Sequence, residues 1–322
     1  MKIEKAQKTC LLIAPMSFYS YSEYLKNTLI LRGYNVTVSN DEYPANNIGK
    51  IMGKLRIPLL MYLTGKKIKQ QYLQGKKYNL VLIIKGRGIS TELIKQLKKV
   101  SPKVVAYTYD SFRYHDAPIK WLKYADKFYT FDYLDSERHN ISVIELFSSF
   151  PESLNSKKCT YEISVITRNH SDRLKYIDCV LSNLNVEKKF VYIFEQNIFT
   201  FIQNFIKNPM LYFKFRKHIS FKSLPYDEYT KALHESNFTI DFAHPSQSGI
   251  TIRCFEALSS GTKIITNNPF VSRYKYFNET NTIIYNNTTD PESLRSRFTQ
   301  IANNIPGKHN RTISDFIEDL IS

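Results

Sequence analysis

The sequence predicts an α/β protein with two doubly wound domains, each built on a parallel sheet. Short apolar runs typical of strands alternate with helical segments along the whole chain, and this alternation implies right-handed βαβ units. The length of 322 residues suits two domains of about 150 residues each. A polar, proline-containing stretch at 148–158 separates two such series of strands and helices.

The first series predicts an N-terminal domain over 1–150. Apolar and aromatic content and flanking turn residues indicate its strands, which are 9–15, 33–39, 78–86, 102–110 and 126–132. Helices are expected at about 22–31 and 90–99. Between the second and third strands, apolar residues from Ile48 to Leu55 follow helical spacing, and Pro58 should bend or end that helix.

The second series predicts a C-terminal domain over 151–308, followed by a terminal segment over 309–322. Its expected strands are 161–167, 190–194, 238–242, 262–266 and 282–285. A helix at about 311–321 should occupy the terminal segment.

Composition excludes several classes of protein. With 43% hydrophobic residues, 23 tyrosines and 21 phenylalanines, the chain is not expected to be disordered. Its longest apolar run, 57–63, is far shorter than the roughly 20 residues of a membrane span, and the N-terminus lacks a signal cleavage site. The four cysteines are scattered without metal-ligand spacing, so we expect no bound metal and a reduced, cytoplasmic environment.

The net charge of +16 is concentrated in two blocks. Residues 43–91 hold ten Lys or Arg and no Asp or Glu, and residues 196–226 hold five and none. Apolar residues interleave with these cations, so the segments 50–77 and 205–222 could rest on an anionic membrane surface. A solvated basic face is the equal alternative. No nucleic-acid partner is expected, because no binding motif for DNA or RNA accompanies the charge.

The most informative stretch is HPSQSGITIRCFEALSSGTKIIT, residues 244–266. A predicted strand delivers this loop to the sheet edge, where Gly249 would let a ligand approach the backbone and Ser248 or Thr251 would cap the next helix. The free N–H groups of that helix start favour an anion such as a diphosphate. Glu256 lies about two turns further on, where a carboxylate can accept both hydroxyls of a ribose.

This layout resembles the donor domain of the GT-B glycosyltransferases. The resemblance implies two Rossmann-like domains facing a cleft, a metal-independent transfer of sugar from a nucleotide-sugar, no cofactor, and a terminal helix that crosses back onto the first domain. In the commonest retaining branch a second acidic residue lies eight positions before the ribose-binding Glu, and here that position is Ser248. Donor sugar and stereochemistry therefore stay open. The donor-binding candidates are His244, Ser246, Gln247, Ser248, Gly249, Ile250, Thr251 and Glu256.

Loops after the other strands supply the remaining candidates, because strand C-terminal ends share one edge of a parallel sheet. Arg173, in the loop region after 161–167, should neutralise the donor diphosphate, as the resemblance implies; a surface salt bridge is the alternative. Arg253 and Lys263 are interpreted as structural. Ser17, Lys85 and Arg87 in the first domain are candidates for acceptor binding.

Asp110 and His115 form the tightest carboxylate–imidazole grouping at such an edge, where a base could deprotonate an acceptor hydroxyl. Asp110 is the preferred base if the reaction inverts, and it would only orient the acceptor if the reaction retains. Asp110 could instead cap a helix, and His115 could be an ordinary loop histidine. The surrounding YDSFRYH and the later DKFYTFDYLDSER resemble a pattern of bacterial lipopolysaccharide and capsule glycosyltransferases, in which "DS" and "FD..D" recur.

Together these features predict a bacterial glycosyltransferase that works on a lipid-linked or polysaccharide acceptor, in the cytoplasm and peripheral to the inner face of the membrane. A nucleotide-sugar epimerase on the same scaffold and a non-catalytic polyanion-binding protein are the alternatives. The nucleotide base, the sugar, the acceptor and the oligomeric state are left open.

Overall fold

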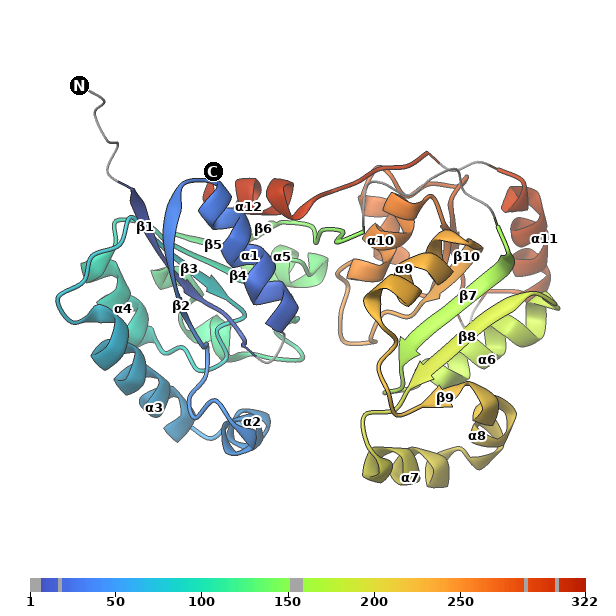
Figure 1. Cartoon of the computed structure of the whole chain (residues 1–322), viewed down its shortest axis with the longest axis horizontal. Coiled ribbons are helices and arrows are strands. Elements are labelled where there is room, and N and C mark those ends of the chain that lie inside the picture. The colour runs from blue at the N-terminus through green and yellow to red at the C-terminus, as the bar shows by residue number, and fades with distance from the viewer. Residues whose placement is uncertain (1–6, 17–18, 151–158, 287–288, 305–306) are drawn as a thin grey trace. The chain divides into compact units, whose positions relative to one another are not determined.

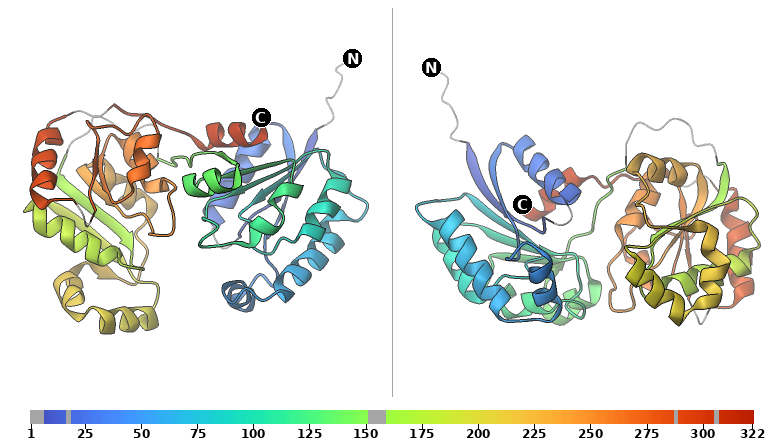
Figure 2. Two further views of the ribbon diagram at one scale, coloured as in Figure 1. Left: turned by 180° about the vertical axis from the view of Figure 1, so that it is seen from behind. Right: turned by 60° about the horizontal axis from the view of Figure 1, so that its bottom comes forward.

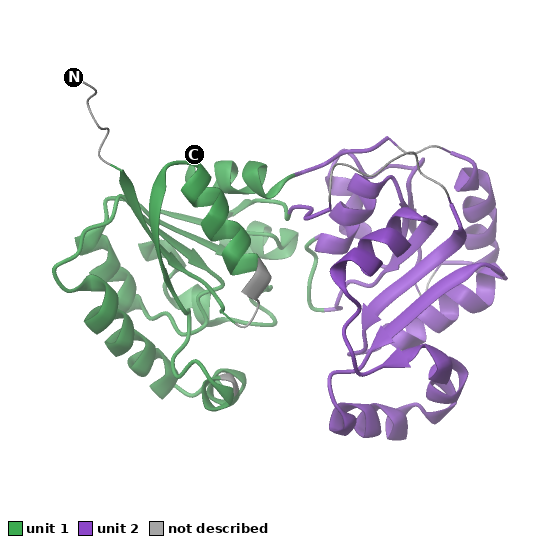
Figure 3. Ribbon diagram, in the orientation of Figure 1, with its two compact units in different colours: residues 1–146, 246–249, 312–322 green, residues 147–245, 250–311 purple. Residues whose placement is uncertain are grey.

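The computed structural model describes residues 7–16, 19–150, 159–286, 289–304 and 307–322 (Figure 1). The chain forms two compact units (Figure 3). Unit 1 comprises Met1–Leu146, Ser246–Gly249 and Thr312–Ser322, and unit 2 comprises Phe147–Pro245 and Ile250–Arg311. Each unit has a parallel six-stranded sheet with helices against it, so the predicted α/β class with two Rossmann-like domains is confirmed. Most of the predicted break at 148–158 lies outside the described residues.

The sheet of unit 1 has the strand order β2-β1-β3-β4-β5-β6, with every neighbouring pair parallel. Its strands are β1 Lys8–Ile13, β2 Tyr34–Ser39, β3 Leu80–Ile84, β4 Val104–Thr108, β5 Lys127–Thr130 and β6 Ser142–Val143. Every residue of β3 and β4 is buried, as expected for central strands that carry helices on both faces.

Helices cover both faces of this sheet (Figure 2). They are α1 Tyr19–Leu31, α2 Asn47–Lys54, α3 Leu59–Ile68, α4 Thr91–Val100, α5 Tyr133–His139 and α12 Ile313–Ile321. Pro58 directly precedes α3, so the predicted helix break is confirmed. The terminal helix α12 packs beside α1, and Arg32, just after α1, pairs with Glu318 at 3.0 Å. The Phe316 ring of α12 also meets the Tyr107 ring of β4 edge-on at 4.9 Å.

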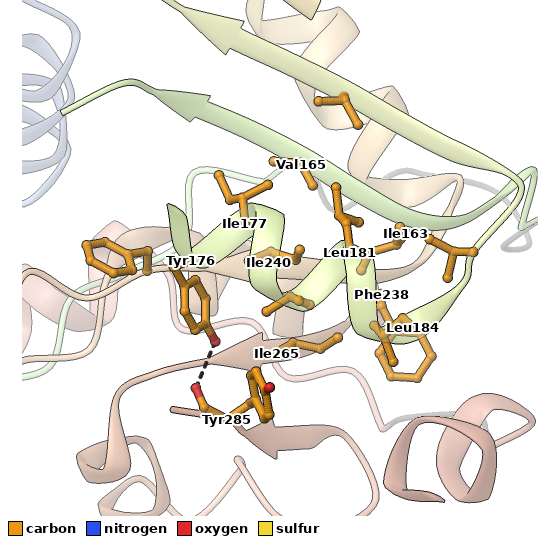
Figure 4. Packing of buried hydrophobic residues seen from close by; sticks show 14 of the residues in the cluster. Ile163, Val165, Tyr176, Ile177, Leu181, Leu184, Phe238, Ile240, Ile265 and Tyr285 are labelled. Atoms are coloured by element: carbon orange, nitrogen blue, oxygen red, sulfur yellow. Dashed lines mark hydrogen bonds between the residues drawn. The ribbon is translucent and has the colours of Figure 1, made fainter. Parts of the chain in front are cut away.

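The sheet of unit 2 has the order β12-β11-β10-β7-β8-β9, again all parallel. Its elements are β7 Tyr161–Arg168, α6 Arg173–Leu184, β8 Lys189–Phe194, α7 Ile198–Lys207, α8 Pro209–Phe215, β9 Ile219–Ser220, α9 Tyr226–His234, β10 Ser236–Asp241, α10 Ile252–Ser260, β11 Lys263–Thr266, β12 Thr282–Ile284 and α11 Pro291–Ala302. The core fills the space between α6 and the sheet, where the Tyr176 hydroxyl donates to the Tyr285 carbonyl at 3.0 Å (Figure 4).

The helical pair α7 and α8 was not anticipated from the sequence. Its aromatic and basic residues interleave, a pattern that indicates a membrane-docking segment or a solvated basic face without indicating a pair of helices. An Asn197 capping box starts α7, and Pro209 occupies the first turn of α8. Across the described residues, no helix is long and apolar enough to span a bilayer.

Candidate functional site

Basic residues gather in unit 2 at the C-terminal ends of the neighbouring strands β7 and β10. Arg168 is the last residue of β7 and Arg173 the first of α6, and Arg253 lies in the first turn of α10. Parallel strands bring these ends to a single edge of the sheet, which is where α/β proteins bind ligands.

Arg173 is held in place by the ends of both strands. Its Nη1 donates to Thr167 Oγ1 at 3.0 Å and to the Arg168 carbonyl at 3.2 Å, and its Nη2 donates to the Phe242 carbonyl at 3.3 Å. Its Nε is buried and has no hydrogen-bond partner among the described residues. Burial, followed by the charge of Arg253, lowers the pKa of Arg173 to about 10. The Arg173 guanidinium is therefore held in one orientation, but among the described residues it forms no ion pair with a carboxylate.

Arg253 faces the same edge, and its interpretation as merely structural is incomplete. One guanidinium nitrogen lies 3.8 Å from Asp241 Oδ1, while the buried Nε has no partner in the described part of the chain. Asp241 already accepts hydrogen bonds from Thr251 at 2.6 Å and Thr266 at 3.1 Å. Against the effect of burial, the negative charges of Tyr229, Asp241 and Glu256 raise the pKa of Arg253. Lys263 is structural as expected, since its Nζ donates to the Ala302 carbonyl at 2.9 Å.

The electrostatics of this edge favour an anion. Desolvation, and after it the charges of Arg173 and Arg168, lowers the pKa of His170. His244, half-buried after β10, also opposes the protonation of His170. Neighbouring positive charges thus oppose the charged forms of both His170 and Arg173, and a bound diphosphate would relieve this repulsion.

The helix that carries Glu256 begins differently from the prediction. Thr251 occupies the N-cap position of α10, but its side chain makes no cap hydrogen bond and donates to Asp241 instead. The expectation of a Thr251 or Ser248 side-chain cap is therefore wrong. The helix N–H groups are left for another acceptor. Gly261 ends α10 in the left-handed conformation.

Glu256 is buried on α10, and the Tyr229 hydroxyl from α9 donates to its Oε2. Burial raises the pKa of Glu256, and burial followed by the Glu256 charge raises the pKa of Tyr229. The tyrosine therefore stays protonated and fixes the orientation of the Glu256 carboxylate. A carboxylate that accepts hydrogen bonds from ligand hydroxyls needs such a fixed orientation.

The segment 246–249 belongs to unit 1 and is anchored there (Figure 3). The Ser248 amide and hydroxyl donate to the two carboxylate oxygens of Asp132 at 2.6 and 2.7 Å. A Cβ on Gly249 would lie 2.2 Å from the Phe131 ring, so this ring requires the glycine. The Ser246 carbonyl accepts a hydrogen bond from Ser111 at 2.6 Å.

These contacts explain the "DS" and "FD..D" pattern structurally. Ser111, Phe131 and Asp132 each contact the segment 246–249. Asp135 accepts the Phe112 amide at 2.6 Å, which ties the first half of the pattern to the second. Of the other predicted donor residues there, Ile250 is buried and Gln247 is half-buried.

A second polar cluster lies at the strand C-terminal edge of unit 1. Lys85 Nζ and Asp110 Oδ2 form an ion pair at 2.7 Å. The backbone of Lys85 has a φ of 69°, in the left-handed region, which costs a non-glycine residue roughly 1–2 kcal/mol. Gly86 follows with a φ of 69°, and a Cβ there would lie 2.7 Å from Trp121. This strained turn directs the Lys85 ammonium toward Asp110.

Asp41 and Glu42, just after β2, complete this cluster and were missed from the sequence. The Arg87 amide donates to Asp41 Oδ2 at 3.1 Å, and the Arg87 guanidinium lies 3.6 Å from Glu42. Lys85 and Arg87, expected to bind an acceptor anion, are thus both paired with carboxylates. Burial raises the pKa of Asp41 to about 6.

His115 is buried beside this cluster. Burial, followed by the charge of Arg87, lowers its pKa to about 4, so the imidazole is neutral at pH 7. Its Nε2 has no hydrogen-bond partner among the described residues. Asp116, next in the chain, pairs with Arg56 at 3.0 Å. Ser17, the third predicted acceptor residue, lies outside the described residues.

Replacing Asp41 by Asn should stabilise the protein at neutral pH. The carboxyl has a folded-state pKa of about 6 against an ordinary 3.8, so folding with an ionised Asp41 costs about 2–3 kcal/mol above pH 6. The cost disappears as the pH falls from 6 toward 3.8. Thermal unfolding should give Asp41→Asn a higher Tm at pH 7 and an unchanged Tm near pH 3.5. A lower Tm at pH 7 would show that the charge of Asp41 is required.

Comparisons with known proteins support the fold. No protein-family model and no curated protein sequence matches the chain. Among solved structures, it is similar to AviGT4, a glycosyltransferase involved in avilamycin A biosynthesis, with 10% identity, 98% of this chain and 96% of that chain covered, and a TM-score of 0.58. It is also similar to the lipopolysaccharide outer core galactosyltransferase WaaB, with 12% identity, 97% and 95% coverage, and a TM-score of 0.54.

The UDP-GlcNAc 2-epimerase of Methanocaldococcus jannaschii is a third structural relative. It shares 10% identity over 98% of this chain and 99% of that chain, with a TM-score of 0.54. At such identities the comparisons establish the fold alone. That fold, two Rossmann-like units in one chain, is the one used by GT-B glycosyltransferases and by nucleotide-sugar epimerases.

Proposed function

We propose that the protein is a glycosyltransferase that moves a sugar from a nucleotide-sugar to a glycan or lipid-linked acceptor. One observation carries the proposal: at the edge of β7 and β10, the buried Nε atoms of Arg173 and Arg253 have no hydrogen-bond partner among the residues that the structure describes. Along α10 the same edge carries Glu256, whose carboxylate is fixed by Tyr229. An anion site beside a fixed carboxylate matches the diphosphate and the ribose of a nucleotide.

In this proposal Arg173 and Arg253 neutralise the diphosphate and stabilise the charge that develops when the sugar leaves. Guanidinium groups suit this role because they bind phosphate oxygens through two parallel hydrogen bonds. They also perform the charge neutralisation that a divalent metal performs in other enzymes. The reaction is therefore proposed to need neither metal nor cofactor.

The acceptor is proposed to bind unit 1 at the edge that carries Lys85, Arg87, Asp110 and His115. Of the two candidates, His115 has the available proton-accepting atom, because its Nε2 is unpaired within the described residues. Asp110 Oδ2 already forms an ion pair with Lys85 Nζ at 2.7 Å. Asp110 is therefore better suited to orient an acceptor hydroxyl.

The acceptor is further proposed to belong to a bacterial surface glycan assembled at the cytoplasmic face of the membrane. The helical pair α7 and α8 supports this placement, since Phe199, Ile206 and Met210 are 79%, 72% and 81% exposed. They lie within a sequence block that carries five cations and no acidic residue. Exposed apolar side chains beside cations fit an anionic bilayer surface.

Replacing Phe199, Ile206 and Met210 together by serine should release the protein from vesicles that contain anionic lipid. Each apolar side chain that enters the bilayer interface contributes on the order of 1 kcal/mol, so co-sedimentation should weaken at least about tenfold. Leu31→Ser is the matched control, because Leu31 is 88% exposed outside both basic blocks. If the triple variant and the parent protein bind the vesicles equally, the proposal that this helical pair docks on the membrane is wrong.

A nucleotide-sugar epimerase is the second candidate, supported by the structural similarity to UDP-GlcNAc 2-epimerase. The two functions differ in what they require. Incubation with nucleotide-sugars should release free nucleotide at a rate that depends on an added glycan acceptor if the protein is a transferase. Conversion of the donor sugar without any acceptor would favour the epimerase.

A further inference from the structure

Unit 1 contains a groove, lined by both polar and apolar side chains, that the proposed chemistry does not use. It is a cavity of about 510 Å³ between α3 and the start of α4. A π-helical turn, Lys69–Leu73, continues α3 along one wall, and such turns frequently occur at functional sites. The α3 side of the groove carries Tyr62, Gly65, Lys66, Lys69, Gln70 and Gln74. Ser90, Glu92 and Gln96 line the opposite wall on and before α4.

The side chains of the first wall have no partners in the part of the chain that the structure describes. In that part, Lys66 and Lys69 make no ion pair, and the side-chain amides of Gln70 and Gln74 make no hydrogen bond. On the other wall, Gln96 donates to Glu92 at 3.2 Å and Ser90 caps α4 by accepting the Leu93 amide at 3.2 Å. One wall is thus already engaged, while the other offers free donors and acceptors to a ligand.

Gly65 lies within α3 on the lining of the groove. A glycine inside a helix costs about 1 kcal/mol relative to alanine. Helix packing does not require it here, because a Cβ at Gly65 would meet no atom within 4 Å. Its effect is to keep the wall of the groove open.

The lining selects one class of ligand. Amides, a hydroxyl and the Glu92 carboxylate suit hydroxyl groups, the two lysines suit a negative charge, and the Tyr62 ring, 65% exposed, can pack against the apolar face of a sugar. The Glu92 charge disfavours a uniformly anionic polymer such as nucleic acid. We infer that the groove binds a polyhydroxylated glycan that carries an anionic group.

This inference deepens the proposed function by naming the chemical class of the acceptor. Ser90 in the groove follows directly on the segment Lys85–Ile89, which carries the acceptor-side cluster. A glycan chain held in the groove would therefore have one end close to Lys85 and Arg87 in the same unit. The groove would recognise the part of the acceptor remote from the reacting hydroxyl.

The test is the affinity of the full-length chain for a uronic acid-containing tetrasaccharide, compared with a neutral tetrasaccharide of the same length. Gly65→Leu should fill the groove and weaken binding at least about tenfold, without disturbing α3, since leucine favours helix. The double variant Gln70→Ala and Gln74→Ala should weaken binding of both sugars. Lys66→Ala should weaken binding of the acidic sugar alone.

Lys67→Ala and Gln71→Ala are the matched controls, because both residues are exposed and neither lines the groove. Unchanged affinity in the controls, with loss in Gly65→Leu, supports the inference. Equal losses at Lys66 and Lys67 would indicate general charge attraction and overturn it, as would no binding to the parent protein. Gly65→Leu should leave the affinity for nucleotide unchanged. If the parent protein binds the glycan but no nucleotide, the proposed transferase is rejected while the groove remains a glycan site.

Discussion

Glu256→Gln should weaken nucleoside diphosphate binding by about 100-fold, because a charged carboxylate that accepts two ribose hydroxyls contributes about 1.5–3 kcal/mol per hydrogen bond. Glutamine keeps the shape and can still accept the Tyr229 hydroxyl, but it loses the charge and one acceptor. Glu256→Ala should abolish binding altogether. Isothermal titration of the parent protein and both variants measures the effect directly.

Tyr229→Phe provides a graded comparison for Glu256. It removes the hydroxyl that orients the carboxylate but leaves the charge, so the loss should be smaller, about five- to tenfold. Similar circular dichroism spectra would show that the variants are folded. Unchanged nucleotide affinity in both Glu256 variants would assign the carboxylate to the packing of α9 against α10.

Arg173→Ala should lower the rate of sugar transfer by about 10²–10³, the usual cost of removing one group that stabilises charge in a transition state. The structure orients this guanidinium through Thr167, Arg168 and Phe242, which restricts it before any ligand binds. Steady-state rates with a fixed donor should fall mainly in kcat, because the charge on the diphosphate grows as the bond to the sugar breaks.

Lys175→Ala is the control for Arg173, since Lys175 lies in the first turn of the same helix, is exposed, and pairs with Asp172 at 3.2 Å. Its activity should equal that of the parent protein. Arg173→Lys keeps a charge but loses the planar fork, so it should recover only a small part of the rate. Full activity in Arg173→Ala would contradict the proposed role.

The sheets could be predicted because their central strands are buried on both faces and therefore form unbroken apolar runs. Val104–Thr108 and Leu80–Ile84 are examples in which every residue is buried. Helix α7 does carry a helical pattern, because Ile198, Phe201, Ile202 and Phe205 recur at spacings of three and four residues. An interpretation of this segment from its charge alone overlooks that pattern.

Chain order alone predicts where Arg173 and Glu256 lie, since Arg173 begins the helix after β7 and Glu256 lies on the helix after β10. Asp41 carries no motif, and its raised pKa comes from burial by residues distant in sequence. The sequence indicates only a structural role for Arg253, because the direction of a side chain around a helix depends on the register of the helix against the sheet. Ser248 and Gly249 were assigned to a ligand, whereas their partners in the structure are Asp132 and Phe131, more than 110 residues earlier.

The most direct test of the nucleotide site is a thermal-shift panel of the full-length protein with UDP, GDP, CMP and ADP and their sugar conjugates, with and without magnesium. A ligand at 100 times its dissociation constant stabilises the folded state by about 2.7 kcal/mol. The proposed arginine and glutamate site predicts a clear rise in Tm with one base, equal in the presence and absence of magnesium. No shift with any nucleotide, together with stabilisation by polyanions, would contradict the account.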